Sequence, residues 1–133
     1  MKTGTYSEVH ALKRFSDLIT IEQFGTGKFV KGLPAPEDVE AARSGLEKAR
    51  GAMGSGQYGL IILEEANVAV YFGLFSVEEL LNLIAEKPEA VEMVITGRGA
   101  PPEIVDRADL VTEMKCVKHY FNKGVSARTG IEK

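Results

Sequence analysis

Helix-like and strand-like segments alternate along this chain, and this alternation limits its fold more than any other feature. Strands that alternate with helices form a mainly parallel sheet, because each helix returns the chain to the edge where the next strand begins. The expected fold is therefore α/β, a parallel sheet with helices on both faces. The expected strands are residues 18–24, 60–63, 91–96 and 110–117.

The expected helices show apolar residues at steps of three and four. Pro36 suits the first turn of the longest helix, and Ser76 with Glu79 forms a capping box at the start of another. Residues 60–63 are a continuous apolar run, which is typical of a strand buried on both faces. We expect Cys116, in the last strand, to lie in the core. The expected helices are 7–15, 36–53, 76–87 and one that begins at Pro101.

Length and charge narrow the class of protein. The 133 residues suit a single domain, 1–133, and the net charge of −3 argues against binding to nucleic acid or to a membrane surface. One cysteine excludes an intrachain disulfide and fits a reducing compartment, so we expect a cytoplasmic location. No apolar run approaches the roughly 20 residues that a membrane-spanning helix needs.

The segment FGTGKFVKG, residues 24–32, contains some letters of a phosphate-binding loop. Such a loop follows G-x-x-x-x-G-K-S/T, in which glycines let the backbone wrap the phosphates and the hydroxyl binds Mg²⁺. Here Glu22 occupies the position of the first glycine, and Phe29 follows the lysine. The segment is therefore not a P-loop.

Two acids follow the second expected strand at its carboxyl end. Ligands of parallel α/β sheets gather at the carboxyl ends of the strands. Glu64 and Glu65 stand there after residues 60–63. An acid in this place can hold a Mg²⁺ ion that bridges nucleotide phosphates. The alternative is a strand end with two solvated glutamates.

A Gly-Arg-Gly turn follows the third expected strand. Gly97, Arg98 and Gly99 lead directly into the start of the next helix. Helix starts carry free N–H groups, and the guanidinium offers paired donors that match phosphate. The turn therefore indicates an anion site. The alternative is a tight turn whose arginine points into water.

With these segments in place, the chain resembles the ATP:cob(I)alamin adenosyltransferases of the P-loop type, also called corrinoid adenosyltransferases. The resemblance implies a RecA-like α/β fold that binds MgATP and cobalamin or another corrinoid. It implies attack of Co(I) on the ribose 5′ carbon of ATP, with triphosphate leaving. The similar stretches are MKTGTYSEVHALKRF with ITIEQFGTGKFV, then LIILEEANVAVYFGLFSVEELL, and VITGRGAPPEIVDRADLVTEMKCVKHYFNKGVSARTGIE.

The resemblance also implies roles for single residues. Glu65 matches the family's Mg²⁺-binding glutamate and, with Arg98, would serve catalysis, whereas Glu64 stands where the family usually has Asp. Lys31 falls where relatives carry Trp, and this chain has no Trp. The implied nucleotide contacts are Glu64, Glu65, Asn67, Thr96, Gly97, Arg98 and Gly99. The implied corrinoid contacts are Phe29, Val30 and Lys31.

The resemblance places the phosphate cradle upstream of Met1, in about 35–40 residues, the length of one βαβ unit. Without the cradle, we expect weak binding of MgATP, and we expect neighbouring strands to expose apolar side chains and backbone groups. A second copy in a homo-oligomer (a dimer) or another partner would cover that surface. Three interpretations stay open: an adenosyltransferase whose sequence starts late, a non-catalytic module that binds a corrinoid or a subunit, and an inert fragment.

Overall fold

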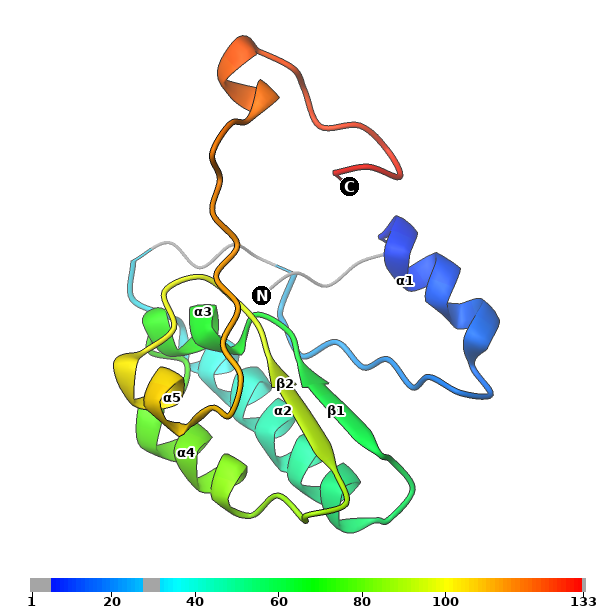
Figure 1. The fold of residues 1–133 in the computed structure, drawn as a ribbon, viewed down its shortest axis with the longest axis vertical. Coiled ribbons are helices and arrows are strands. Elements are labelled where there is room, and N and C mark those ends of the chain that lie inside the picture. Colours follow the sequence, from blue (N-terminus) through cyan, green and yellow to red (C-terminus); the bar gives the residue numbers. More distant parts are fainter. Residues whose placement is uncertain (1–5, 28–31, 133) are drawn as a thin grey trace. The chain divides into compact units, whose positions relative to one another are not determined.

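The computed structural model describes residues 6–27 and 32–132, and these residues form two compact units. The first unit contains the described residues between 23 and 109, and the second joins residues 6–22 to residues 110–132. Figure 1 shows the sheet and the helices α2 to α5 of the first unit. The turns that directly follow the two strands belong to this first unit.

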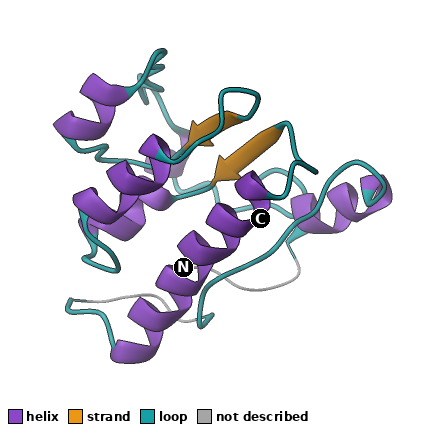
Figure 2. Cartoon of the chain, turned by 90° about the horizontal axis from the view of Figure 1, so that it is seen from below, coloured by secondary structure: helices purple, strands orange, loops and turns teal. Residues whose placement is uncertain are grey.

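A parallel pair of strands forms the sheet of the first unit. Strand β1, Leu60–Leu63, pairs with strand β2, Glu92–Ile95, so that Leu60 lies opposite Glu92 and Leu63 lies opposite Ile95. Their carboxyl ends therefore meet at one edge (Figure 2). This pairing agrees with the predicted α/β class. The helices of this unit are α2 Pro36–Gly54, α3 Ala66–Tyr71, α4 Val77–Ala85 and α5 Pro102–Arg107.

The helices begin where the sequence predicts. Pro36 opens α2, where its fixed φ suits a first turn and its missing N–H is not needed. At the start of α4, the backbone N–H of Glu79 donates to Ser76 Oγ at 3.1 Å, and the backbone N–H of Ser76 donates to Glu79 Oε2 at 2.7 Å. The predicted capping box is therefore confirmed. Helix α3 is an addition, because the sequence pattern did not predict it.

The core of the first unit lies on one face of the sheet. Alternate residues of the strands, such as Ile61 and Met93, pack against buried residues of α2 and α4. The opposite face exposes Leu60 (50%), Ile62 (58%) and Val94 (43%). The prediction that residues 60–63 are buried on both faces is therefore wrong. The helices of this unit cover one face only, so side chains alternate between core and surface with the period of two that a strand imposes.

The second unit contains short helices and extended chain. Helix α1, Ser7–Leu12, continues as a 3₁₀ turn, Lys13–Phe15, which confirms the predicted helix at 7–15. A second 3₁₀ turn, η2, covers Tyr120–Lys123. Within the described residues, no helix combines the length and the apolar character that a membrane span requires.

Two predicted strands are not strands in the structure. Residues 18–24 and 110–117 have no strand assignment, so the described sheet has two strands rather than four. Cys116, expected in the core, is exposed. The physical reason is the same for both segments: an apolar run becomes a strand only where another strand supplies hydrogen bonds.

Candidate functional site

The residues that follow β1 and β2 are tied together at the carboxyl edge of the sheet. The backbone N–H of Thr96 donates to the carbonyl of Leu63 at 3.1 Å, which extends the strand pairing by one residue. The hydroxyl Oγ1 of Thr96 accepts from the backbone N–H of Glu65 at 3.0 Å. The backbone carbonyl of Thr96 accepts from the backbone N–H of Asn67 at 3.2 Å. Thr96 therefore joins the acidic turn after β1 to the glycine turn after β2.

Glu65 has an unusual backbone conformation at this edge. Its φ is 60° and its ψ is 20°, which places it in the left-handed region, and among the described residues it is the only non-glycine residue with a positive φ. Such a conformation costs a residue with a Cβ about 1–2 kcal/mol. Glu65 precedes α3, but its side chain does not cap that helix. The strained turn leaves both Glu64 and Glu65 exposed at the edge of the sheet.

Asn67 packs against the glycine turn from the other side. Its side-chain amide Nδ2 donates to the carbonyl of Gly97 at 3.3 Å, while its Oδ1 is buried and has no hydrogen-bond partner among the described residues. Gly97 has a φ of 123°, and a Cβ at that position would lie 3.1 Å from Asn67 Cβ and 3.1 Å from the backbone nitrogen of Val68. Gly97 is thus required both for its φ and for the close approach of α3.

Arg98 and Gly99 complete the turn. Arg98 is exposed, and no ion pair within the described ranges involves Arg98, Glu64 or Glu65. The guanidinium and the carboxylates are therefore available to a ligand. Helix α5 begins at Pro102 and has six residues. So short a helix adds little charge at its start, so its terminus gives little support to the predicted anion site.

Tyr71 also belongs to this edge, and the sequence did not single it out. Gly99 has a φ of 67°, and a Cβ at Gly99 would lie 3.9 Å from Tyr71 Cδ2. Tyr71 comes four residues after Asn67 on α3, and residues at this spacing share one side of a helix. That spacing is the signal that would have found it, had the helix been predicted.

The donors at this edge suit Mg²⁺ better than a metal that is held by protein ligands alone. The part of the chain that the structure describes contains no group of three or more His, Cys, Asp or Glu residues arranged around a common metal position. Mg²⁺ usually takes one or two carboxylates and completes its shell with water and substrate phosphates. The exposed carboxylates of Glu64 and Glu65 fit that requirement.

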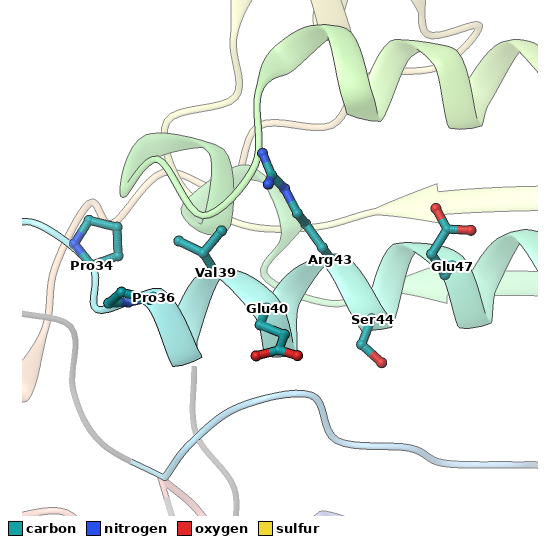
Figure 3. A pocket seen from close by; sticks show the side chains of 7 residues that line it. All are labelled: Pro34, Pro36, Val39, Glu40, Arg43, Ser44 and Glu47. Carbon is teal, nitrogen blue, oxygen red and sulfur yellow. The ribbon is translucent and has the colours of Figure 1, made fainter.

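The predicted corrinoid contacts and a surface hollow remain to be located. The predicted corrinoid contacts Phe29, Val30 and Lys31 lie outside the described residues. A wide, open hollow of about 630 Å³ lies along the first half of α2 (Figure 3). One of its charged residues, Arg43, already pairs with Glu79 at 3.0 Å. None of the predicted site residues that the structure describes lines this hollow, whose lining is Pro34, Pro36, Val39, Glu40, Arg43, Ser44 and Glu47.

Comparison with known proteins identifies relatives along most of the chain. Residues 1–132 match the family ATP:corrinoid adenosyltransferase BtuR/CobO/CobP. A corrinoid adenosyltransferase of Pseudomonas aeruginosa is 32% identical over 120 residues, which cover 90% of this chain and 59% of that protein. One of Sinorhizobium sp is 32% identical over 121 residues, which cover 90% of this chain and 56% of that protein. The corrinoid adenosyltransferase CobA of Salmonella typhimurium is 36% identical over 73 residues, which cover 55% of this chain and 37% of that protein.

These matches confirm the resemblance to corrinoid adenosyltransferases that the sequence motifs indicate. The chain spans less than two thirds of the length of the first two relatives, 59% and 56%.

Proposed function

Because the chain belongs to the family of ATP:corrinoid adenosyltransferases, we propose that the carboxyl edge of β1 and β2 binds the triphosphate of ATP during adenosylation of a corrinoid. The observation that carries this proposal is the bond of Thr96 to Glu65 at 3.0 Å, which holds the acidic turn beside the Gly-Arg-Gly turn. The acids and the arginine belong to these two joined turns, and no ion pair within the described residues links them, which suits a site for a metal-bound anion.

The proposed reaction transfers the 5′-deoxyadenosyl group of ATP to Co(I) of the corrinoid substrate. Cobalt supplies both electrons of the new Co–C bond, the bond between C5′ and oxygen breaks, and triphosphate leaves with that electron pair. Because cobalt is the nucleophile, the protein needs no nucleophile of its own. Its tasks are to position the two substrates and to stabilise the charge that develops on the leaving group.

Each residue of the edge has a role in this proposal. Arg98 contacts the triphosphate with a planar set of donors that matches the geometry of phosphate oxygens. Glu65 holds Mg²⁺, with Glu64 beside it. When bound, Mg²⁺ neutralises phosphate charge and orients the leaving group. Asn67, Thr96, Gly97 and Gly99 fix the distance between the acidic turn and the glycine turn.

The proposal also includes corrinoid contacts and a larger sheet with a phosphate cradle. Phe29, Val30 and Lys31 would face the corrinoid, with Phe29 helping to remove the lower ligand of cobalt. The two strands would form part of a larger RecA-like sheet, in which a phosphate cradle from a P-loop adds the main contacts to ATP. On this proposal the 133 residues alone bind MgATP weakly and are impaired in transfer.

The decisive experiment measures binding and transfer separately in the 133-residue chain. Binding of MgATP is followed by isothermal titration calorimetry, and transfer is followed by the absorption spectrum of chemically reduced cobalamin. We expect Glu65→Gln and Arg98→Ala each to weaken binding of MgATP at least tenfold, since each removes one charged contact. Unchanged binding in both variants would refute the site.

Matched controls separate the site from general loss of charge. Glu92 is exposed and begins β2, opposite Leu60 at the amino ends of the strands, so Glu92→Gln removes the same charge away from the site. Arg107 ends α5, so Arg107→Ala is the corresponding control for Arg98→Ala. Both controls should bind MgATP as the unmodified chain does.

The same assay discriminates the alternative function. The exposed outer face of the sheet favours a non-catalytic module that binds a corrinoid or another subunit. A spectral change of cob(II)alamin with no adenosylation at saturating MgATP would support that module. Adenosylation by the isolated chain would exclude it.

A further inference from the structure

Tyr71 carries an exposed aromatic ring beside the turn that the proposed function assigns to the triphosphate. The ring is 75% exposed, although it belongs to the short helix that packs against the turn. Its neighbour Phe72 meets it edge to face, with ring centroids 5.3 Å apart and an angle of 86° between the planes. An aromatic ring that contacts one neighbouring ring and is otherwise largely open to solvent can accept another ring on its face.

The spacing on α3 aligns Tyr71 with the glycine turn. Asn67 and Tyr71 are four residues apart and share one side of the helix. Asn67 contacts the turn at Gly97, and Tyr71 approaches it at Gly99. The two glycines lack side chains that would separate the helix from the turn, so the ring lies within a few ångströms of the backbone that flanks Arg98.

We propose that Tyr71 stacks on the purine base of the nucleotide whose triphosphate Arg98 binds. The proposal rests on the proposed function and adds the residue that recognises the base. Stacking of a base on an aromatic side chain strengthens binding by about 5- to 150-fold and tolerates different bases, because every base has a π-face. Tyr71 is then a specificity-determining residue for nucleotides over free polyphosphate.

The test compares two ligands in three proteins. MgATP and magnesium tripolyphosphate are titrated into the unmodified chain, Tyr71→Ala and Tyr71→Phe. Stacking predicts that Tyr71→Ala loses at least fivefold in affinity for MgATP and less than twofold for tripolyphosphate. Tyr71→Phe keeps the aromatic face and should bind both ligands as the unmodified chain does. Equal losses for both ligands in Tyr71→Ala would mean that Tyr71 only shapes the turn, and would overturn the proposal.

A spectroscopic arm reports stacking directly. The fluorescence of 2-aminopurine riboside triphosphate falls when its base stacks, so the unmodified chain should quench it and Tyr71→Ala should not. Quenching that persists in Tyr71→Ala would also overturn the proposal. Ile62→Ala serves as the control, because Ile62 is an exposed apolar side chain on the outer face of the sheet. Failure of the unmodified chain to bind either ligand would instead refute the proposed function, and with it the role of Tyr71.

Discussion

Replacing Gly97 by alanine tests the geometry of the candidate site most directly. The φ of 123° lies in a region that residues with a Cβ rarely adopt, and this strain alone costs about 1–3 kcal/mol. The new Cβ would also lie 3.1 Å from the backbone nitrogen of Val68, which cannot move without shifting α3. Overpacking of this kind adds about 1–3 kcal/mol. We therefore expect Gly97→Ala to reduce the free energy of unfolding by about 3 kcal/mol.

Alanine substitutions at two other glycines should change the free energy of unfolding by smaller, graded amounts. A Cβ at Gly99 would meet one atom at 3.9 Å, so Gly99→Ala should suffer from its φ of 67° alone and lose about 1 kcal/mol. Gly51 lies inside α2, and a Cβ there would meet nothing within 4 Å, so Gly51→Ala should gain about 0.5–1 kcal/mol. The measurement is urea unfolding followed by far-ultraviolet circular dichroism. A loss below about 1 kcal/mol for Gly97→Ala would refute the close approach of α3 to the turn.

Three further predictions concern strain, charge and burial. Glu65→Gly should raise the free energy of unfolding by about 0.5–1 kcal/mol by relieving a φ of 60°, while calorimetry shows the loss of MgATP binding. Hydrogen bonding to the backbone of Ser76, and then the pairing with Arg43, lower the pKa of Glu79 below its ordinary 4.5. Its charge therefore stabilises the fold above pH 4.5, and the deficit of Glu79→Gln, about 0.5 kcal/mol at pH 7, should vanish in urea unfolding as the pH falls through the lowered pKa. In the same assay, Ile61→Ala should lose about 2 kcal/mol, and Ile62→Ala less than 1, because Ile61 faces the core and Ile62 faces outward. Equal losses would show that the outer face is covered in solution.

Local signals predict where the helices begin and that the turns after β1 and β2 share one edge of the sheet. Pro36 and the capping box of Ser76 and Glu79 act within a few residues of themselves, so their effect does not depend on distant parts of the chain. The parallel pairing of β1 and β2 follows from the helices α3 and α4 between them, which return the chain to the same starting edge. That pairing brings Glu65 and Arg98 to one edge, as expected from their places after the two strands.

The structure of the turns could not be read from the sequence. Glutamate rarely adopts the left-handed conformation, so no residue pattern announces it at Glu65. Helix α3 follows immediately and has six residues, too few for an apolar period to be recognised. Without that helix, the alignment of Asn67 and Tyr71 along the glycine turn cannot be recognised from the sequence.

The two segments wrongly predicted as strands show what an apolar pattern does and does not specify. Both 60–63 and 110–117 contain apolar residues, yet the first segment is a strand and the second has no regular secondary structure, with Leu110 and Met114 exposed. A pattern describes the side chains that a segment offers, whereas a strand also needs a neighbour whose N–H and C=O groups are free to pair. For β1 that neighbour is β2, delivered by α4 and held by the shared core. Burial, like strand pairing, needs a neighbouring element. The helices of the first unit cover one face of the strand pair and leave the apolar outer face exposed, so residues 60–63 are buried on one side alone.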